Sequence, residues 1–273
     1  MIRTEGLRFA YLGAEEVLRG IDLEIQDGEF VAIMGENGAG KTTLVKTFNG
    51  LLLPTAGKVM VDGVDTHDSS PARLSKDVGL VFQNPDHQLF SETVKEELAF
   101  SLRNFGYGEE TIQRRVNTIL EALDLTRYAE SSPFVLSGGE RKRVALAAVL
   151  VWNPKHIILD EPTIGQDYQQ KDRLRNFIIQ LNSQGKTVVI ITHDVEFVAE
   201  CKPRIVLLSK GVVIADGRAE DILSDDPMLE KASLTRPQIG MLMHQLRDLG
   251  LPDRVIDVYS AQQAILRALG VED

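Results

Sequence analysis

The 273-residue chain contains a single cysteine, Cys201, so it can form no internal disulfide bond. One cysteine in a chain of this length is typical of a protein that folds in a reducing compartment. The sequence has no run near the roughly 18 apolar residues of a membrane-spanning helix. Its first residues, MIRTEGLRFAY, lack the apolar core of a secretory signal peptide. We therefore expect a protein that meets a membrane only through a partner.

Basic residues are also in short supply, with 30 Lys and Arg against 40 Asp and Glu, for a net charge of −10 at pH 7. Because sequence-independent binding of nucleic acid depends on neutralising phosphates, this balance disfavours DNA or RNA as a partner. It disfavours direct adsorption to anionic lipid for the same reason. Hydrophobic residues make up 43% of the chain, which suits one large domain with an appendage or two modest domains.

Apolar runs of strand length alternate with helical spacings across residues 30–209, which predicts a mostly parallel sheet buried on both faces. Two earlier runs, 6–11 and 21–25, are bounded by turn signals and are typical of strands. The spacing within residues 91–125 is helical. From about residue 219, short helical stretches are separated by proline-containing breaks, which predicts a helical appendage.

Residues 35–42 read GENGAGKT, a complete match to the phosphate-loop pattern G-x-x-x-x-G-K-[ST]. The match lies between an expected strand, Phe30–Met34, and an expected helix that begins at Lys41, which is the context this motif requires. Glycine N–H groups and the helix N-terminus suit phosphate oxygens. Lys41 supplies a charge for the β- and γ-phosphates, and Thr42 supplies a hydroxyl for Mg²⁺. The alternative, a glycine-rich turn without a ligand, does not require the full pattern.

Two carboxylates end the apolar run HIILDEPT (156–163). Ligands of parallel sheets bind beyond the carboxyl ends of the strands. Asp160 is therefore placed to hold Mg²⁺ or its water, and Glu161 to orient or deprotonate a water beside the γ-phosphate. The alternative is that the pair only caps a helix. His193 follows another apolar run and either bonds the γ-phosphate or has a structural role.

A second anion site is predicted at residues 136–140, which read LSGGE. A serine and two glycines at a helix start present N–H groups to an anion, as in the phosphate loop. The two sites lie roughly a hundred residues apart, and one nucleotide has no obvious use for both.

Together these motifs resemble the ATPase subunit of ABC transporters, over about residues 1–220. The resemblance implies an α/β P-loop NTPase fold with a RecA-like, mostly parallel sheet and an N-terminal antiparallel β-subdomain. It also implies a helical subdomain at about 84–150 and a short helical C-terminal extension, 221–273. In that family two ATPase domains pair head to tail, and each ATP lies between the phosphate loop of one and the LSGGE-type signature of the other.

The resemblance also implies residue roles. Catalytic roles fall to Lys41, Gln83, Glu161 and His193, and Mg²⁺ contacts to Thr42, Gln83 and Asp160. Nucleotide contacts fall to Tyr11, Gly35, Asn37, Gly38, Ala39, Gly40, Lys41, Thr42, Thr43, Ser137, Gly138 and Gly139. Tyr11 would stack on adenine, unless it is an ordinary exposed strand tyrosine. The family's D-loop position reads TIGQD (163–167), with Gln166 where leucine is common.

Residues 83–100, QNPDHQLFSETVKEELAF, resemble the corresponding segment of energy-coupling-factor importers, including cobalt and nickel uptake systems. The resemblance implies that residues 84–100 form part of a groove for a coupling helix of a transmembrane T component. It also implies a separate substrate-binding membrane subunit and a place at the cytoplasmic face of the cell membrane. The acidic residues expected to meet basic side chains of the partner, unless they only form a solvated helix face, are Asp86, Glu92, Glu96 and Glu97.

The expected function is ATP hydrolysis that powers uptake of a micronutrient, either a transition metal ion such as cobalt or nickel or a vitamin. The dimer is either a homodimer or a heterodimer with a related ATPase. The alternatives are the ATPase of another ABC importer, an exporter ATPase, or a non-transport ABC ATPase that acts on nucleic acid or ribosomes. A P-loop kinase or GTPase does not explain LSGGE. The helix expected within residues 236–250 either packs on the core or contacts a second copy.

Overall fold

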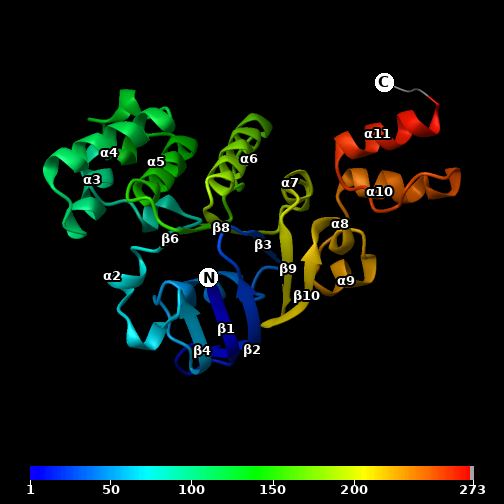
Figure 1. Cartoon of the computed structure of the whole chain (residues 1–273), viewed down its shortest axis with the longest axis horizontal. Coiled ribbons are helices and arrows are strands. Elements are labelled where there is room, and N and C mark those ends of the chain that lie inside the picture. Colours follow the sequence, from blue (N-terminus) through cyan, green and yellow to red (C-terminus); the bar gives the residue numbers. More distant parts are fainter. Residues whose placement is uncertain (271–273) are drawn as a thin grey trace.

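The computed structural model describes residues 1–270 and contains two β-sheets with helices around them (Figure 1). The first sheet is antiparallel, with strand order β2-β1-β4-β5. It confirms the expected antiparallel β-subdomain, although the runs at 6–11 and 21–25 are parts of longer strands. Its strands are β1 (Ile2–Ala10), β2 (Glu16–Ile25), β4 (Ala56–Val61) and β5 (Val64–Asp65).

The second sheet has the order β10-β9-β3-β8-β7-β6, in which all neighbours are parallel except the β9–β10 hairpin. Its central strands β3, β7, β8 and β9 are almost wholly buried, as continuous apolar runs predict for a sheet covered on both faces. This sheet confirms the P-loop fold. Its strands are β3 (Phe30–Met34), β6 (Val78–Val81), β7 (His156–Asp160), β8 (Thr187–Thr192), β9 (Arg204–Ser209) and β10 (Val212–Arg218).

Helices cover both faces of the second sheet. Helix α1 packs between the two sheets, where Leu44 and Phe48 are fully buried. Helices α6 to α9 cover the opposite face. The helices are α1 (Lys41–Phe48), α2 (Pro71–Leu74), α3 (Val94–Asn104), α4 (Glu109–Ala122), α5 (Gly138–Leu150), α6 (Tyr168–Ser183), α7 (Val195–Cys201), α8 (Ala219–Ile222), α9 (Asp226–Lys231), α10 (Gln238–Gln245) and α11 (Val258–Ala268).

Helices α3, α4 and α5 form a subdomain with a core of its own, at the left of Figure 1. In α3, Val94, Leu98 and Leu102 recur every fourth residue and are fully buried. Gly79 of β6 lets α5 approach the main sheet, because a Cβ there would lie 2.4 Å from Cγ1 of Val149. The subdomain that carries LSGGE is thus packed directly on the edge of the P-loop sheet.

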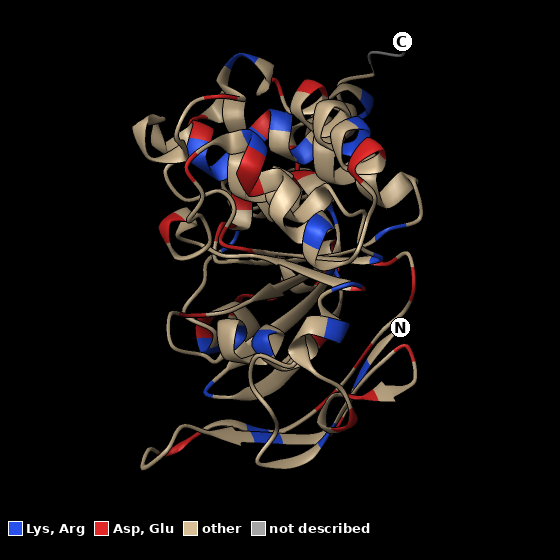
Figure 2. Cartoon of the chain, turned by 90° about the vertical axis from the view of Figure 1, so that its left-hand side faces the viewer, with Lys and Arg blue, Asp and Glu red and all other residues tan. Residues whose placement is uncertain are grey.

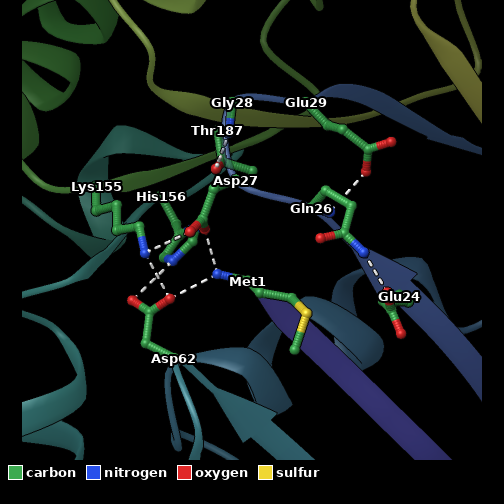
Figure 3. Close-up of polar contacts among 10 residues, drawn as sticks. All are labelled: Met1, Glu24, Gln26, Asp27, Gly28, Glu29, Asp62, Lys155, His156 and Thr187. Atoms are coloured by element: carbon green, nitrogen blue, oxygen red, sulfur yellow. Dashed lines mark hydrogen bonds and ion pairs between the residues drawn. The ribbon is translucent and has the colours of Figure 1, made fainter.

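An ion-pair cluster joins the two sheets on the side opposite the carboxyl ends of the parallel strands (Figure 3). Asp62 Oδ1 accepts from the Met1 ammonium (2.6 Å) and from Lys155 Nζ (2.7 Å), and Lys155 also pairs with Asp27 at 2.9 Å. Nε2 of the fully buried His156 lies 3.1 Å from Asp62 Oδ2. Because two ammonium groups already neutralise both carboxylates, the cluster is built as an ion-pair network and not as a cation site.

The C-terminal segment continues the core of the second sheet. Ile222, Leu223, Leu229 and Ile256 are buried in one cluster with Phe197 of α7. This part of the chain therefore packs on the core, while Leu249 and other apolar side chains stay exposed; the boundary at residue 220 stays a prediction. Within residues 1–270, no helix is both long enough and apolar enough to cross a bilayer.

Candidate active site

The phosphate loop joins β3 to α1, as the sequence predicts. Its glycines are needed for close approach. A Cβ on Gly35 would lie 2.0 Å from the carbonyl oxygen of Leu208, and Gly35 has a φ of 145°. Gly40 forms the N-cap of α1 with a φ of 101° and no side-chain cap. The first N–H groups of α1 are therefore left for an anionic ligand.

Lys41 points back into the loop. Its Nζ donates to the carbonyl oxygens of Gly35 (2.7 Å) and Glu36 (2.9 Å), and the side chain is buried. Burial lowers the pKa of Lys41, which the carboxylates of Glu161, Asp160 and Glu36 oppose. The ammonium is thus enclosed by the loop, where phosphate oxygens compensate its charge better than carbonyl oxygens do.

Thr42 and Asp160 bring the start of α1 to the tip of β7. Thr42 Oγ1 donates to Asp160 Oδ2 at 2.9 Å. Asp160 is 5% exposed, and its other oxygen, Oδ1, has no hydrogen-bond partner among the described residues. Burial raises the pKa of Asp160. A hydroxyl beside an unsatisfied carboxylate oxygen fits Mg²⁺, which prefers oxygen ligands and few protein groups.

Glu161 and His193 meet at the tips of β7 and β8. Glu161 Oε1 lies 2.9 Å from His193 Nδ1, and the Glu161 amide donates to the carbonyl of Ile191 at 2.8 Å. Glu161 has a φ of 48°, a left-handed conformation that is costly for a glutamate and is common at active sites. Its buried Oε2 has no hydrogen-bond partner within residues 1–270. This carboxylate oxygen is free to hold a water molecule.

The other predicted residues of the nucleotide site lie around this centre. The Tyr11 hydroxyl lies 3.2 Å from Thr43 Oγ1, and Tyr11 is 45% exposed. Gln83 follows β6 and lines a cavity of about 470 Å³ together with Asp160 and Glu161. The remaining predicted loop residues, Asn37, Gly38 and Ala39, form the outer turn and its base.

The LSGGE segment forms the start of α5. Ser137 is the N-cap in a capping box, its Oγ donating to Glu140 Oε2 at 2.7 Å. Hydrogen bonds from Ser137 and then Tyr128 lower the pKa of Glu140 to about 2. Ser137 and Gly138 are exposed, and Gly139 lines the same cavity as Glu161. The structure therefore places the exposed N-terminus of α5 at the cavity that Asp160 and Glu161 also line.

Three polar contacts around this site were not predicted. Gln88 accepts from the Phe82 amide (3.2 Å) and donates to the Ala145 carbonyl of α5 (2.7 Å). The second is an ion pair between Asp86 and Arg141 of α5. In the third, Lys142 of α5 donates to the carbonyl of Ile164, beside Gln166. Each residue lies in or beside a predicted motif, but no sequence pattern identifies its distant partner.

One expectation for the acidic residues of 84–100 is wrong. Glu97 is only 4% exposed, and its Oε2 accepts from the amides of Phe90 (2.9 Å) and Ser91 (2.7 Å). It stabilises the preceding loop and is not available to a partner. The Asp86 carboxylate already has Arg141 at 2.8 Å, whereas Glu92 and Glu96 are exposed.

Comparison with known proteins places this fold and site. Residues 18–164 match the family described as ABC transporter. The energy-coupling factor transporter ATP-binding protein EcfA of Methanothermobacter thermautotrophicus is 39% identical over 273 residues, covering 99% of this chain and 88% of that protein. Some relatives are longer, and the chain spans 43% of the length of one of them.

Two solved structures are similar over most of the chain. The first is cbiO1 of Clostridium perfringens, described as part of the ABC transporter complex cbiONQ (TM-score 0.76, 34% identity, 89% of this chain and 98% of that one). The second is the dimeric ATP-binding cassette MJ0796, bound to ADP and phosphate (TM-score 0.73, 32% identity, 80% and 99%).

A phosphate loop, an acidic pair at a strand tip and a neighbouring histidine define a P-loop ATPase. The chain belongs to the ABC transporter family and is one of its ATP-binding, ATP-hydrolysing proteins.

Proposed function

We propose that this chain is the ATPase subunit of an energy-coupling-factor type importer at the cytoplasmic face of the cell membrane. It would act with a transmembrane T component and a substrate-binding membrane subunit to take up a transition metal ion, such as cobalt or nickel, or a vitamin. The similarity to EcfA and cbiO1 supports the class. The observation that carries the proposal for this chain is the exposed aromatic pair Phe90 and Phe100. It lies on the segment after Gln83, which contacts α5.

The chemistry follows from the chain's own groups. Mg²⁺, held by Thr42, Asp160 and Gln83, would neutralise charge on the phosphates. Lys41 and the α1 N-terminus bind the β- and γ-phosphate oxygens and favour charge that develops there. Glu161 orients or deprotonates the attacking water through its free oxygen, and His193 holds the other oxygen of Glu161 in place (2.9 Å).

Two chains complete one site in this proposal. The exposed Ser137, Gly138 and Gly139 would contact the γ-phosphate bound by the phosphate loop of the partner ATPase. For this contact the Ser137 hydroxyl turns from the Glu140 carboxylate to the phosphate. Because the chain carries both halves and every catalytic group, two copies suffice; the alternative is pairing with a related ATPase subunit.

The proposed docking surface consists of the exposed side of residues 84–100. Phe90 is 59% exposed and Phe100 43% exposed, and their rings meet edge to face with centroids 4.6 Å apart. Beside Phe100 along α3, residues such as Glu96 line a hollow of about 300 Å³ between α3 and α4. Acidic and basic residues are interspersed on the helices of this side (Figure 2). An apolar pair with a charged rim suits an amphipathic coupling helix.

Two contacts connect the docking surface to α5, the helix that begins within LSGGE. Gln88 connects the end of β6 to α5 through the Ala145 carbonyl, and Asp86 reaches Arg141 one turn into α5. Movement of the helical subdomain on ATP binding and hydrolysis would therefore move Phe90 and Phe100 with α5. This gives a direct route from the nucleotide to the membrane partner.

The test is a pull-down of the tagged chain from native membranes, followed by mass spectrometry. The parent chain should recover a small T-type membrane protein and a substrate-binding membrane protein, whose identity points to the substrate. The double variant Phe90→Ser/Phe100→Ser should lose both while MgATP binding is retained. The control is Leu249→Ser, which changes an apolar side chain that is 75% exposed in the C-terminal segment.

Recovery of only ribosomal or nucleoid proteins by the parent chain would contradict the importer proposal and favour a non-transport ATPase. Equal recovery of the membrane proteins by the double variant would contradict the docking surface alone.

A further inference from the structure

The C-terminal segment touches the phosphate loop itself. Ser233 Oγ donates to Glu36 Oε2 at 3.0 Å, across 197 positions of sequence. Glu36 is the second residue of GENGAGKT, and its carbonyl oxygen accepts from Lys41 Nζ. Two hydrogen bonds through Glu36 thus connect Ser233 to Lys41, the residue that is expected to bind the β- and γ-phosphates.

The backbone conformation at position 233 does not explain why the residue there is a serine. Ser233 has a φ of 55° at the end of α9, where its amide donates to the Glu230 carbonyl and the Leu234 amide to the Leu229 carbonyl. This is the Schellman arrangement, in which glycine is preferred at the left-handed position. Serine is less stable than glycine in this backbone conformation, but its hydroxyl makes the contact with Glu36 that glycine cannot make.

The end of α9 is fixed to the base of the phosphate loop. Ser209 Oγ donates to the Lys231 carbonyl at 2.9 Å. Two residues later, the Gly211 amide donates to the Ala39 carbonyl of the loop at 3.1 Å. Ser233 therefore follows a helix whose end is hydrogen-bonded to Ser209, and the nearby Gly211 is hydrogen-bonded to the phosphate loop.

Ion pairs and a backbone hydrogen bond also fix the rest of the C-terminal segment. Arg236 is 7% exposed and pairs with Asp226 and Asp253. The Gln238 amide at the start of α10 donates to Glu196 of α7 at 2.8 Å. These contacts keep the segment, and Ser233 with it, in one position relative to the sheet.

We propose that Ser233 is a positioning residue for the phosphate loop, through which the C-terminal segment raises the affinity of the loop for MgATP. Glu36 is an acid in a loop that binds a polyanion. Its hydrogen bond to Ser233 orders the loop and keeps the carboxylate engaged away from the phosphates. Without Ser233 the loop gains freedom that binding must remove, and the carboxylate is free to repel the ligand. The proposal requires ATP binding only and does not depend on the membrane partner.

The decisive variant is Ser233→Gly in the full chain, because glycine suits the left-handed backbone and removes only the hydroxyl. We expect the Kd for MgATP, measured by calorimetry, and the KM to rise about three- to tenfold, as for loss of one exposed hydrogen bond. The kcat should stay within about twofold, and Tm should be unchanged or higher. Ser233→Asn should restore affinity, because asparagine tolerates this backbone and its amide donates to a carboxylate.

Two controls separate positioning from general stability. Asn153→Gly, at another left-handed residue (φ 62°), should leave MgATP affinity unchanged. In a Glu36→Ala background, Ser233→Gly should have no further effect on Kd. An unchanged Kd in Ser233→Gly, a fall in its Tm, or the same loss of affinity in Ser233→Asn would each overturn the proposal.

Discussion

His156 makes the stability of the protein depend on pH in a way that can be calculated. Its side chain is fully buried between the two sheets, and burial lowers its pKa. Lys155 and the Met1 ammonium in the same cluster also disfavour a second positive charge, whereas Asp62 favours one. As pH falls through the ordinary pKa of about 6.5, the histidine therefore takes up a proton more readily in the unfolded chain than in the folded one.

The unfolded state then binds more protons, so the free energy of unfolding falls as pH falls. The loss between about pH 7.5 and pH 5.5 is at most about 1.4 kcal/mol, the value reached when folded His156 stays neutral throughout. Asp62 adds nothing in this window. Although burial opposes the shift, hydrogen bonds from Lys155 and the Met1 ammonium hold its pKa below the ordinary value. Its contribution is lost only at more acidic pH.

The assay is urea unfolding followed by circular dichroism at these two pH values, for the parent chain and for His156→Gln. Glutamine keeps a donor toward Asp62 but does not titrate, so the variant should lose less free energy of unfolding than the parent between the two pH values, by up to about 1.4 kcal/mol. The exposed His87→Gln is the control and should behave as the parent does. Equal losses in the parent and His156→Gln would refute the reasoning, whatever the stability of the variant at neutral pH.

Two further predictions concern the site. Glu161→Gln should lower kcat about 10²- to 10⁴-fold because it removes the group that we propose orients or deprotonates water, with the Kd for MgATP nearly unchanged in calorimetry; a kcat within tenfold of the parent would contradict that role. Gln88→Ala should lower the free energy of unfolding by about 1–3 kcal/mol in urea titrations, because it breaks two contacts between β6 and α5; an unchanged midpoint would show that these contacts contribute nothing.

The sequence predicts the local parts of the site well. Phe30–Met34 is an uninterrupted apolar run, and the strand, loop and helix around Lys41 follow as expected. Asp160, Glu161 and His193 lie at the tips of adjacent strands because parallel strands end at the same edge of a sheet. Motif and periodicity suffice here because each element is defined by residues close together in sequence.

Contacts between distant segments could not be predicted in this way. Ser233 with Glu36, and Gln88 with the Ala145 carbonyl, join ordinary polar residues whose proximity depends on the whole fold. Glu97 is different, because it lies three residues after the buried Val94 and therefore on the apolar face of α3. Helical spacing alone could have separated it from the exposed Glu96.

The central proposal is that the LSGGE signature of one chain completes the ATP site of another. Sedimentation of Glu161→Gln, with and without saturating MgATP, tests it directly, because slow hydrolysis leaves ATP bound. We expect a shift from monomer to a species of twice the mass, abolished by adding Gly138→Asp, whose carboxylate would meet the γ-phosphate. A chain that dimerises equally well with Gly138→Asp would contradict this claim. A chain that stays monomeric with MgATP bound would contradict completion of the site by a second copy and leave only pairing with a related ATPase subunit.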